Sequence, residues 1–351
     1  MSAAASVLPR PIRDAERLCA RIRAVHDAIR DQVVAACEAT PTEGLAAVVA
    51  EEGGDTVFAI DRVSEAVLVE RFAEIARDWP CLLIAEGLGS DGRLVLPRGS
   101  DPAAVEVVVI VDPIDGTRGL MYQKRPAWIL TGVAAAPPPG GRAPTLSDIA
   151  LAVQTEIPLV KQHLCDQLWA IAGQGAHAER LDRLSGARAP LVLRPSSATT
   201  LLQGFGGLAR FFPGAREELA AIDDAVAEAL LGPPRAGVAQ MFEDQYISSG
   251  GQLYELMVGH DRWIGDLRPL VERALGRRGR SLGICSHPYD MCTVLIARAV
   301  GVVVTDEHGG QVDAPLDVTS NVGWIGYANT TLRDQIAPVL AAILKQRGLG
   351  L

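Results

Sequence analysis

The 351-residue sequence lacks features that would assign it to several classes of protein. No apolar run approaches the ~18–20 residues that a membrane-spanning helix needs, so we expect no integral membrane protein and no membrane partner. There is also no basic tract, since 33 Lys and Arg oppose 42 Asp and Glu, for a formal charge of −9. A nucleic-acid polymer is therefore not an expected partner. Any anionic ligand must be neutralised by something other than a surplus of basic side chains.

The cysteine pattern and the N-terminal residues exclude two further classes. The six cysteines are scattered, and no pair has the C-x-x-C spacing of a metal or redox site. Reduced thiols in a cytoplasmic core are the plain interpretation for a chain of this length. The first apolar stretch is interrupted by Pro9 and Pro11, so it lacks the apolar region of a secretory signal. We expect a cytoplasmic protein.

What the sequence does contain is a globular composition with mixed helix and strand patterns. Hydrophobic residues make up 48% and charged residues 21%, which excludes a disordered chain, a collagen and a coiled coil. Periodicity predicts helices at 13–39, 61–78, 216–231, 251–258, 290–299 and 332–343, and strands at 81–85, 105–111, 128–135, 149–155, 300–305 and 323–327. This mixture favours a layered α/β or α+β fold. A change in composition near residue 190 predicts two subdomains, residues 1–190 and 191–351.

The most informative segment is residues 110–119, Ile-Val-Asp-Pro-Ile-Asp-Gly-Thr-Arg-Gly. Pro113 is expected to end the preceding strand, which would place Asp112 and Asp115 on a turn where they converge with the Ile114 carbonyl between them. Oxygen ligands at a compact turn suit Mg²⁺. The Gly-Thr pair that follows could open a helix and offer backbone amides to an anion. The alternative is a plain Asp-Pro turn with a helix N-cap.

Three further acids stand where an apolar or alternating segment begins or ends. Glu86 follows the apolar run 82–85, Asp61 closes the alternating segment 55–61, and Asp290 precedes an apolar helix. Each also has a plain interpretation when taken alone. Glu86 would then be a solvated turn residue, and the two aspartates would be helix N-caps.

Together and in this order, these places resemble the inositol monophosphatase superfamily, which includes fructose-bisphosphatases and 3′(2′),5′-bisphosphate nucleotidases. Residues 112–117, D-P-I-D-G-T, match its central signature, and residues 55–61 match D-x-V-T-x-x-D except that Phe58 replaces the usual Thr. Residues 85–87 match the G-E-E site in its first Glu, with Gly87 in place of the second. Tyr289-Asp290 matches the late W-D, and residues 299–310 resemble the Gly-containing stretch that follows it. The resemblance covers most of the chain.

The resemblance implies a layered α-β-α-β-α sandwich of the sugar phosphatase type, with the site between its halves, and a homodimer. It implies two Mg²⁺ ions and a third, weaker metal site. The metal ligands implied are Glu86, Asp112, Ile114 through its carbonyl, Asp115 and Asp290. Asp112 would bridge the metals, which would supply the positive field that an acidic protein lacks.

The resemblance also implies catalytic roles. Thr117, linked to Asp61, would help to take the proton of a metal-activated water that Glu86 orients. The water would attack the phosphorus in line, without a covalent intermediate. Residues 248–251 loosely resemble the family's small-residue substrate turn. The substrate-binding residues implied are Asp115, Gly116, Thr117, Ser249, Gly250 and Asp290.

The expected activity is therefore that of a Mg²⁺-dependent phosphomonoesterase acting on a small phosphorylated metabolite, a polyol like inositol monophosphate or a sugar phosphate. The arginine-rich residues 261–287 favour a bisphosphate phosphatase, acting on a 3′(2′),5′-bisphosphate nucleotide or on fructose 1,6-bisphosphate, unless this segment is a solvated helix and loop. Gly87 and the altered residues 291–293 favour a metal- and phosphate-ester-binding regulator with decayed catalysis. Among Arg118, Lys124 and Arg125, one or two could contact the substrate; the alternative is a role in solubility alone.

Overall fold

The computed structural model describes residues 9–45, 48–52, 55–88, 91–277, 279 and 283–349, without the side chains of residues 42–43, 48–52, 55–59 and 61–63. Eight strands form the larger sheet, in the spatial order β10 (Arg188–Pro190), β9 (Gly175–Asp182), β8 (Leu164–Ile171), β7 (Ile149–Ile157), β6 (Ala127–Ala135), β5 (Val107–Asp115), β3 (Cys81–Ala85) and β4 (Arg93–Leu96). Neighbouring strands are antiparallel, except that β3 and β5 are parallel.

A second sheet has the order β11 (Phe205–Leu208), β12 (Asp261–Asp266), β14 (Trp324–Tyr327) and β13 (Val303–Thr305), and β1 (Val48–Glu52) pairs with β2 (Asp55–Phe58). The described helices are α1 (Ala15–Ala39), α2 (Thr42–Leu45), α3 (Ala59–Ile75), α4 (Thr117–Met121), α5 (Arg216–Leu231), α6 (Ser249–Met257), α7 (Arg268–Gly276), α8 (Val294–Ala299) and α9 (Thr330–Gln346). Short 3-10 helices are η1 (Pro102–Ala104), η2 (Leu146–Asp148) and η3 (Pro288–Met291). Among the described helices, none combines the length and apolarity needed to cross a membrane.

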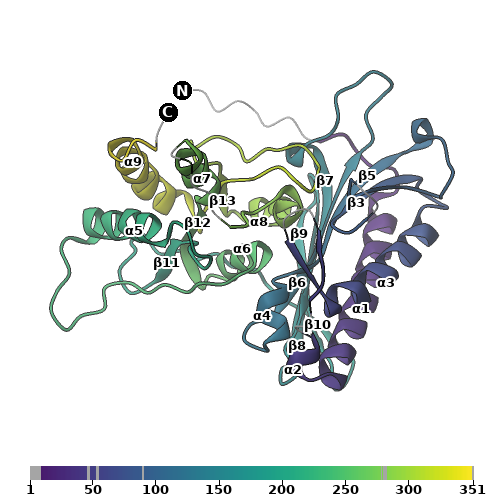
Figure 1. Cartoon of the computed structure of the whole chain (residues 1–351), viewed down its shortest axis with the longest axis horizontal. Helices are drawn as coiled ribbons and strands as arrows, with labels where there is room; N and C mark the ends of the chain where they lie inside the picture. Colours follow the sequence, from purple (N-terminus) through teal and green to yellow (C-terminus); the bar gives the residue numbers. More distant parts are fainter. Residues whose placement is uncertain are drawn as a thin grey trace.

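These elements form five alternating layers (Figure 1). Helices α1 and α3 cover one face of the larger sheet. Helices α6 and α8 cover its other face and also contact the smaller sheet, whose far side carries α5 and α9. The predicted α-β-α-β-α sandwich is confirmed.

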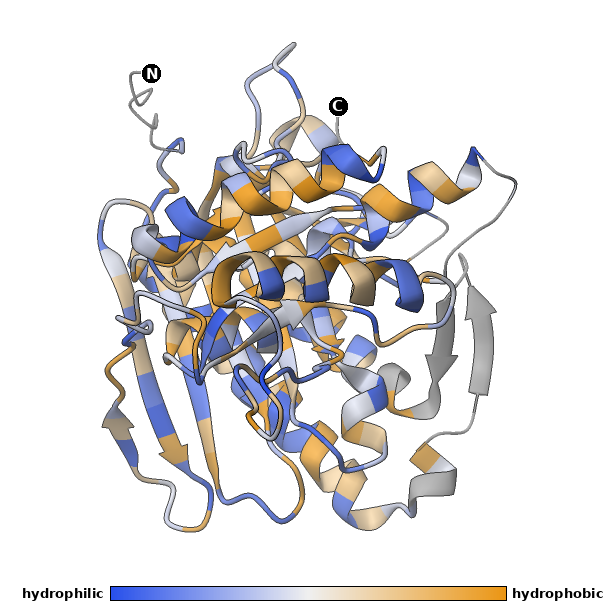
Figure 2. Ribbon diagram, turned by 90° about the vertical axis from the view of Figure 1, so that its left-hand side faces the viewer, coloured by the Kyte–Doolittle hydropathy of each residue, from blue (hydrophilic) through white to orange (hydrophobic). Residues whose placement is uncertain are grey.

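The central strands are apolar along their whole length because both faces of the larger sheet are buried. On β5, Val107, Val109 and Val111 belong to the core beneath α1 and α3, whereas Val108 and Ile110 belong to the core that joins the sheet to the C-terminal half. Figure 2 shows hydrophobic residues gathered in the interior and hydrophilic residues on loops and outer helix faces. Each such side chain contributes about 1.5–3 kcal/mol on burial, so the strand register is strongly specified.

Most predicted elements are present near their expected bounds, but several predictions were wrong. The helix expected from Asp290 begins only at Val294, and Asp290 lies in η3 before it. Helix α3 begins at Ala59, so Asp61 lies inside its first turn rather than at the N-cap. The alternative of a solvated helix and loop was wrong for residues 261–266, which form β12 inside the smaller sheet. The strands β8, β9 and β10 were not predicted from the sequence. The boundary at residue 190 stays a prediction; it falls between β10 and β11.

Candidate active site

Two acidic residues lie where the parallel pairing of β3 with β5 ends. In the register of β3 and β5, Ala85 pairs with Val111, so Glu86 and Asp112 follow at the same edge of the sheet. The carboxyl ends of parallel strands are where ligands bind in open α/β sheets. Glu86 and Asp112 both line the same cavity, and the negative charge of Glu86 helps to raise the pKa of Asp112.

A β-bulge in β5 turns Asp112 and Asp115 to the same side. Residues three apart on a regular strand point to opposite faces. Here Asp112 pairs with Leu130 and Asp115 with Trp128, so β5 has one residue more than β6 between the two pairs. This extra residue brings both acids to one face. The prediction that Pro113 ends the strand was wrong, because a bulge tolerates a residue without a backbone N–H.

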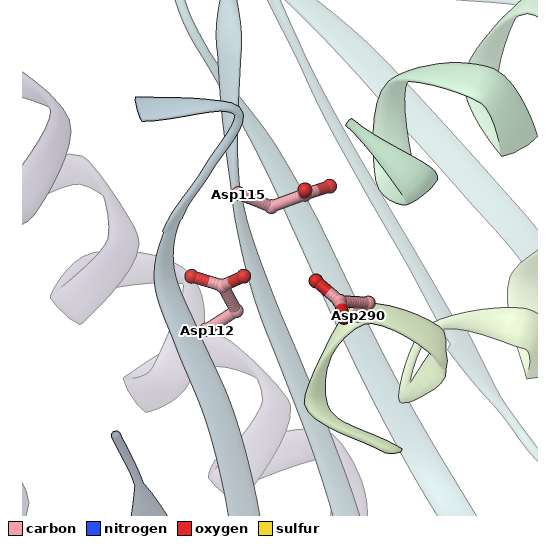
Figure 3. A group of neighbouring side chains, drawn as sticks. All are labelled: Asp112, Asp115 and Asp290. Carbon is pink, nitrogen blue, oxygen red and sulfur yellow. The ribbon is translucent and has the colours of Figure 1, made fainter. Parts of the chain in front are cut away.

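Asp290 reaches the same point from the C-terminal half (Figure 3). Its Oδ2 accepts a hydrogen bond of 2.5 Å from the backbone N–H of His287, which holds the carboxylate within η3. One carboxylate oxygen from each of Asp112, Asp115 and Asp290 lies within 4.8 Å of the others. Opposite oxygen ligands of an octahedral Mg²⁺ are about 4.2 Å apart. A small adjustment would therefore let these side chains share a cation.

The three carboxyl groups lie in an environment that disfavours their charge. The pKa of Asp112 is well above its ordinary value, first because of burial and then because of the nearby Asp115 and Asp290. Burial and the charge of Asp290 raise the pKa of Asp115 to about 8, and burial raises the pKa of Asp290 to about 7. Like charges this close cannot all ionise without compensation. A set of oxygen donors with unbalanced negative charge fits a hard divalent cation such as Mg²⁺.

The turn before α6 fixes the carboxylate of Asp115. The Ser248 hydroxyl donates to Asp115 Oδ2 at 2.7 Å, and the Gly250 backbone N–H donates to the same oxygen at 2.6 Å. The Ser249 backbone N–H also donates to this carboxylate. Ser248 is at the same time the N-cap of α6, since its Oγ accepts a 2.8 Å hydrogen bond from the Gly251 N–H. The expected substrate residues Ser249 and Gly250 therefore contact the expected metal ligand Asp115.

Gly250 is required by the close approach of α6 to the sheet. A Cβ atom at this position would lie 2.5 Å from Cδ2 of Leu130 and 2.9 Å from Oδ2 of Asp115. Both distances are far below a normal van der Waals contact. The absence of a side chain therefore lets the backbone of Gly250 reach Asp115.

The residues after Asp112 form a compact hydrogen-bonded turn. The Ile114 N–H donates to Asp112 Oδ1 at 2.9 Å, and the Thr117 hydroxyl donates to the Ile114 carbonyl at 2.8 Å. Gly116 is the N-cap of α4 and has a φ of 96°, a conformation that favours glycine. All of these residues line the cavity. The side chain of Asp61 lies outside the described residues.

Glu65 on α3 is a cavity residue that the sequence reasoning missed. It lines the same cavity as Glu86 and Gly87. A Cβ atom built on Gly87 would lie 3.6 Å from Glu65 Oε2, so Glu65 places a carboxylate beside the position where the family pattern has its second Glu. The available signal was spacing, since position 65 is one helical turn after Asp61.

Another part of the cavity wall is aromatic and cationic. Phe211 and Phe212 meet edge to face, with ring centroids 4.9 Å apart. The guanidinium of Arg268 lies 4.3 Å from the Phe211 ring centroid, and that of Arg118 lies 5.3 Å from the Phe212 centroid. Arg268 also forms a bidentate pair with Asp266, with N···O distances of 2.8 and 2.5 Å. Much of the Arg268 charge is therefore already compensated.

The other described arginines of residues 261–287 are not among the residues that line the cavity. Arg262 donates to the backbone carbonyls of residues 200, 202 and 203. Arg273 is in an ion pair with Glu307, and Arg278 and Arg280 lie outside the described residues. Among the described arginines of 261–287, only Arg268 lines the cavity.

The three cations that follow residues 112–117 also differ in whether they line the cavity. Arg118 lines the cavity, whereas Lys124 and Arg125 are not among the described residues that line it. Arg125 forms an ion pair with Asp244 and lies over the ring of Tyr246. Arg118 is therefore the member of this group that is placed to contact a substrate.

Comparison with known proteins gives relatives along nearly the whole chain. No family model matches. A curated protein of Methanothermobacter thermautotrophicus, named fructose-1,6-bisphosphatase/inositol-1-monophosphatase, is 26% identical over 285 residues, which cover 81% of this chain and 83% of that protein. The solved structure of Leishmania major fructose-1,6-bisphosphatase has a TM-score of 0.65 at 12% identity and covers 96% of both chains. Extragenic suppressor protein suhB from Bartonella henselae has a TM-score of 0.62 at 14% identity, covering 92% of this chain and 98% of its own. Thermotoga maritima IMPase has a TM-score of 0.56 at 16% identity, covering 94% and 100%. The fold is shared with all three structures.

Proposed function

We propose that the chain is a member of the inositol monophosphatase superfamily and a Mg²⁺-dependent phosphomonoesterase of a small phosphorylated metabolite. The substrate is a polyol phosphate similar to inositol monophosphate, or a sugar phosphate. The observation that carries the proposal is the convergence of Asp112, Asp115 and Asp290 in one cavity. The proposed site lies between subdomains 1–190 and 191–351, since the first supplies two of these acids and the second supplies Asp290.

The charge of the cavity supports two metal ions. In the described part of the chain, the carboxylates that line it are Glu65, Glu86, Asp112, Asp115 and Asp290. The four positive charges of two Mg²⁺ ions would offset most of these five negative charges before phosphate arrives. The proposed ligands are Glu86, Asp112, the Ile114 carbonyl, Asp115 and Asp290, with Glu65 beside Glu86 and a third, weaker site near Asp61. When bound, the ions screen the phosphate dianion and make a water more acidic.

The protein's own groups orient the reactants. In this proposal Glu86 orients the attacking water, whose proton passes through the Thr117 hydroxyl to the carboxylate of Asp61. The hydrogen bond from Thr117 to the Ile114 carbonyl holds that hydroxyl at the edge of the cavity. The water attacks in line with the departing oxygen, without a covalent intermediate. Proposed substrate contacts are Asp115, the backbone amides of Gly116 and Thr117, Ser249, Gly250 and Asp290.

Phosphate release from a panel of esters tests the proposal. The panel contains inositol 1-phosphate, fructose 1,6-bisphosphate and a 3′,5′-bisphosphate nucleotide, each assayed with Mg²⁺ and with a chelator. We expect Mg²⁺-dependent release that Asp112→Asn abolishes, because the variant loses a shared carboxylate. Asp334→Asn is the matched control, since Asp334 is an exposed residue of α9 whose ion-pair partner is Arg333. Full activity in Asp112→Asn, or equal release in the chelator, would contradict the proposal.

Two other functions remain to be separated by the same panel. A bisphosphate phosphatase would need a cation for its second phosphate, and Arg118 and Arg268 are the arginines in the described cavity. Of these two, Arg268 is already paired with Asp266. A regulator with decayed catalysis would bind Mg²⁺ and phosphate esters in calorimetry without turning any of them over. A homodimer and a cytoplasmic location stay predictions, and sedimentation measures the first.

A further inference from the structure

Gln154 is a fully buried polar side chain at the centre of the larger sheet, on β7, and is 0% exposed. The strand register places it in line with the site, because Asp112 pairs with Leu130 on β6 and Leu130 pairs with Gln154 on β7. Directly opposite residues of neighbouring strands point to the same face of a sheet. Gln154 therefore faces the C-terminal half, as Asp112 does.

The Gln154 amide connects the two C-terminal segments that complete the acidic cluster. Its Nε2 donates to the Gly250 carbonyl at 2.8 Å, and its Oε1 accepts from the Thr293 hydroxyl at 3.0 Å. Gly250 in turn donates through its N–H to Asp115. Thr293, which is also 0% exposed, follows Asp290 by three residues. One side chain thus ties both segments to the sheet that carries Asp115.

We propose that Gln154 is a positioning residue of the metal site, which fixes turn 248–251 and turn 290–293 relative to β5. This inference rests on the proposed function and assigns a role to a residue outside the cavity. A planar amide holds a donor and an acceptor in one rigid geometry. Without it, the Thr293 hydroxyl would lose its buried acceptor and the Gly250 carbonyl would lose its bond to the sheet, so each segment could shift. Metal ligands need placement to about 0.5 Å, so such shifts weaken binding.

Gln154→Met removes both hydrogen bonds while keeping a side chain of similar length. The matched control is Gln167→Met on the neighbouring strand β8. Gln167 is also buried, at 2% exposed. Its hydrogen bonds are instead with Arg23, Asp27 and Thr155 on the opposite face. Both variants should lower the denaturation midpoint, because each loses buried hydrogen bonds. Calorimetric titration of the full chain with Mg²⁺ alone distinguishes the two variants.

We expect Gln154→Met to weaken Mg²⁺ binding about tenfold or more, as is usual for residues that orient metal ligands, and Gln167→Met to leave it unchanged. Added Mg²⁺ should restore part of the kcat that Gln154→Met loses. Unchanged Mg²⁺ affinity in Gln154→Met would overturn the inference, and so would equal losses in the two variants. Should Gln154→Met fail to fold, Thr293→Val removes one of the two bonds, and an unchanged affinity there overturns it as well.

The proposed function and this inference fail in different ways. A wild-type chain that binds Mg²⁺ but releases no phosphate from any ester refutes the phosphatase. The comparison of Gln154→Met with Gln167→Met still decides the positioning role in that case. A wild-type chain that binds no Mg²⁺ overturns both.

Discussion

Gly250→Ala probes the close packing that brings α6 against the sheet and against Asp115. The new Cβ would lie 2.5 Å from Leu130 Cδ2 and 2.9 Å from Asp115 Oδ2. Leu130 is fully buried, so any movement of its side chain must displace its packed neighbours. Asp115 is held by its 2.7 Å hydrogen bond from Ser248. The substitution must therefore push α6 away from the sheet or turn the carboxylate out of the cluster.

The magnitude follows from two opposing effects. Overpacking of a close contact costs about 1–3 kcal/mol, and the better helix propensity of Ala returns up to about 1 kcal/mol. The free energy of unfolding without metal should therefore fall by about 0–3 kcal/mol. Gly276→Ala is the matched control, because Gly276 is the last residue of α7 and a Cβ there meets nothing within 4 Å. That variant should be neutral or slightly stabilised.

The decisive assay is Mg²⁺ binding, because either shift disturbs the hydrogen bond by which Gly250 holds Asp115. We expect Gly250→Ala to weaken Mg²⁺ affinity about tenfold, in the range seen when a metal ligand loses its orientation. Gly276→Ala should bind as the wild type does. Denaturation in guanidinium measures the change in the free energy of unfolding separately. Wild-type Mg²⁺ affinity in Gly250→Ala would refute the reasoning, since the contact with Asp115 would then not determine where the carboxylate lies.

Three further outcomes test other parts of the molecule. His26 is buried between the hydroxyls of Thr131 and Thr155, and burial lowers its pKa to about 3. Its unfolded pKa is about 6.5, so stability is complete above that pH and is lost as the pH falls toward 3, by about 2 kcal/mol at pH 5. Denaturation at pH 5 and above pH 6.5 measures this loss of stability. A His26→Gln variant whose stability depends on pH as that of the wild type does would contradict the prediction. Glu65→Gln should weaken Mg²⁺ binding in calorimetry because the cavity loses a charge, whereas Glu70→Gln, at an exposed position of α3, should not; equal affinities would exclude Glu65 from the site. Mg²⁺ added to chelator-treated protein should raise its melting temperature in proportion to the logarithm of concentration, and a constant melting temperature would argue against a native metal site.

Local pattern was enough to predict much of this architecture, and particular residues show why. The apolar run in β5 and the periodicity of α1 and α9 arise from burial that repeats along the chain. The expected acids Asp112, Asp115 and Asp290 were found as conspicuous residues beside such runs, and the structure brings all three together. The bulge at Pro113 was not predicted, because proline is compatible both with a strand end and with a bulge.

The order of residues along the chain determined the strands, the helices and the identity of the acids, because these depend on neighbours within a few positions. The tertiary structure alone decided which groups meet. The hydrogen bond from Gly250 to Asp115 joins residues 135 positions apart, and the one from Gln154 to Gly250 joins residues 96 positions apart. Glu65 and Gln154 have no local signature of their roles, since contacts of this kind arise only after strand register and helix packing have placed distant segments side by side.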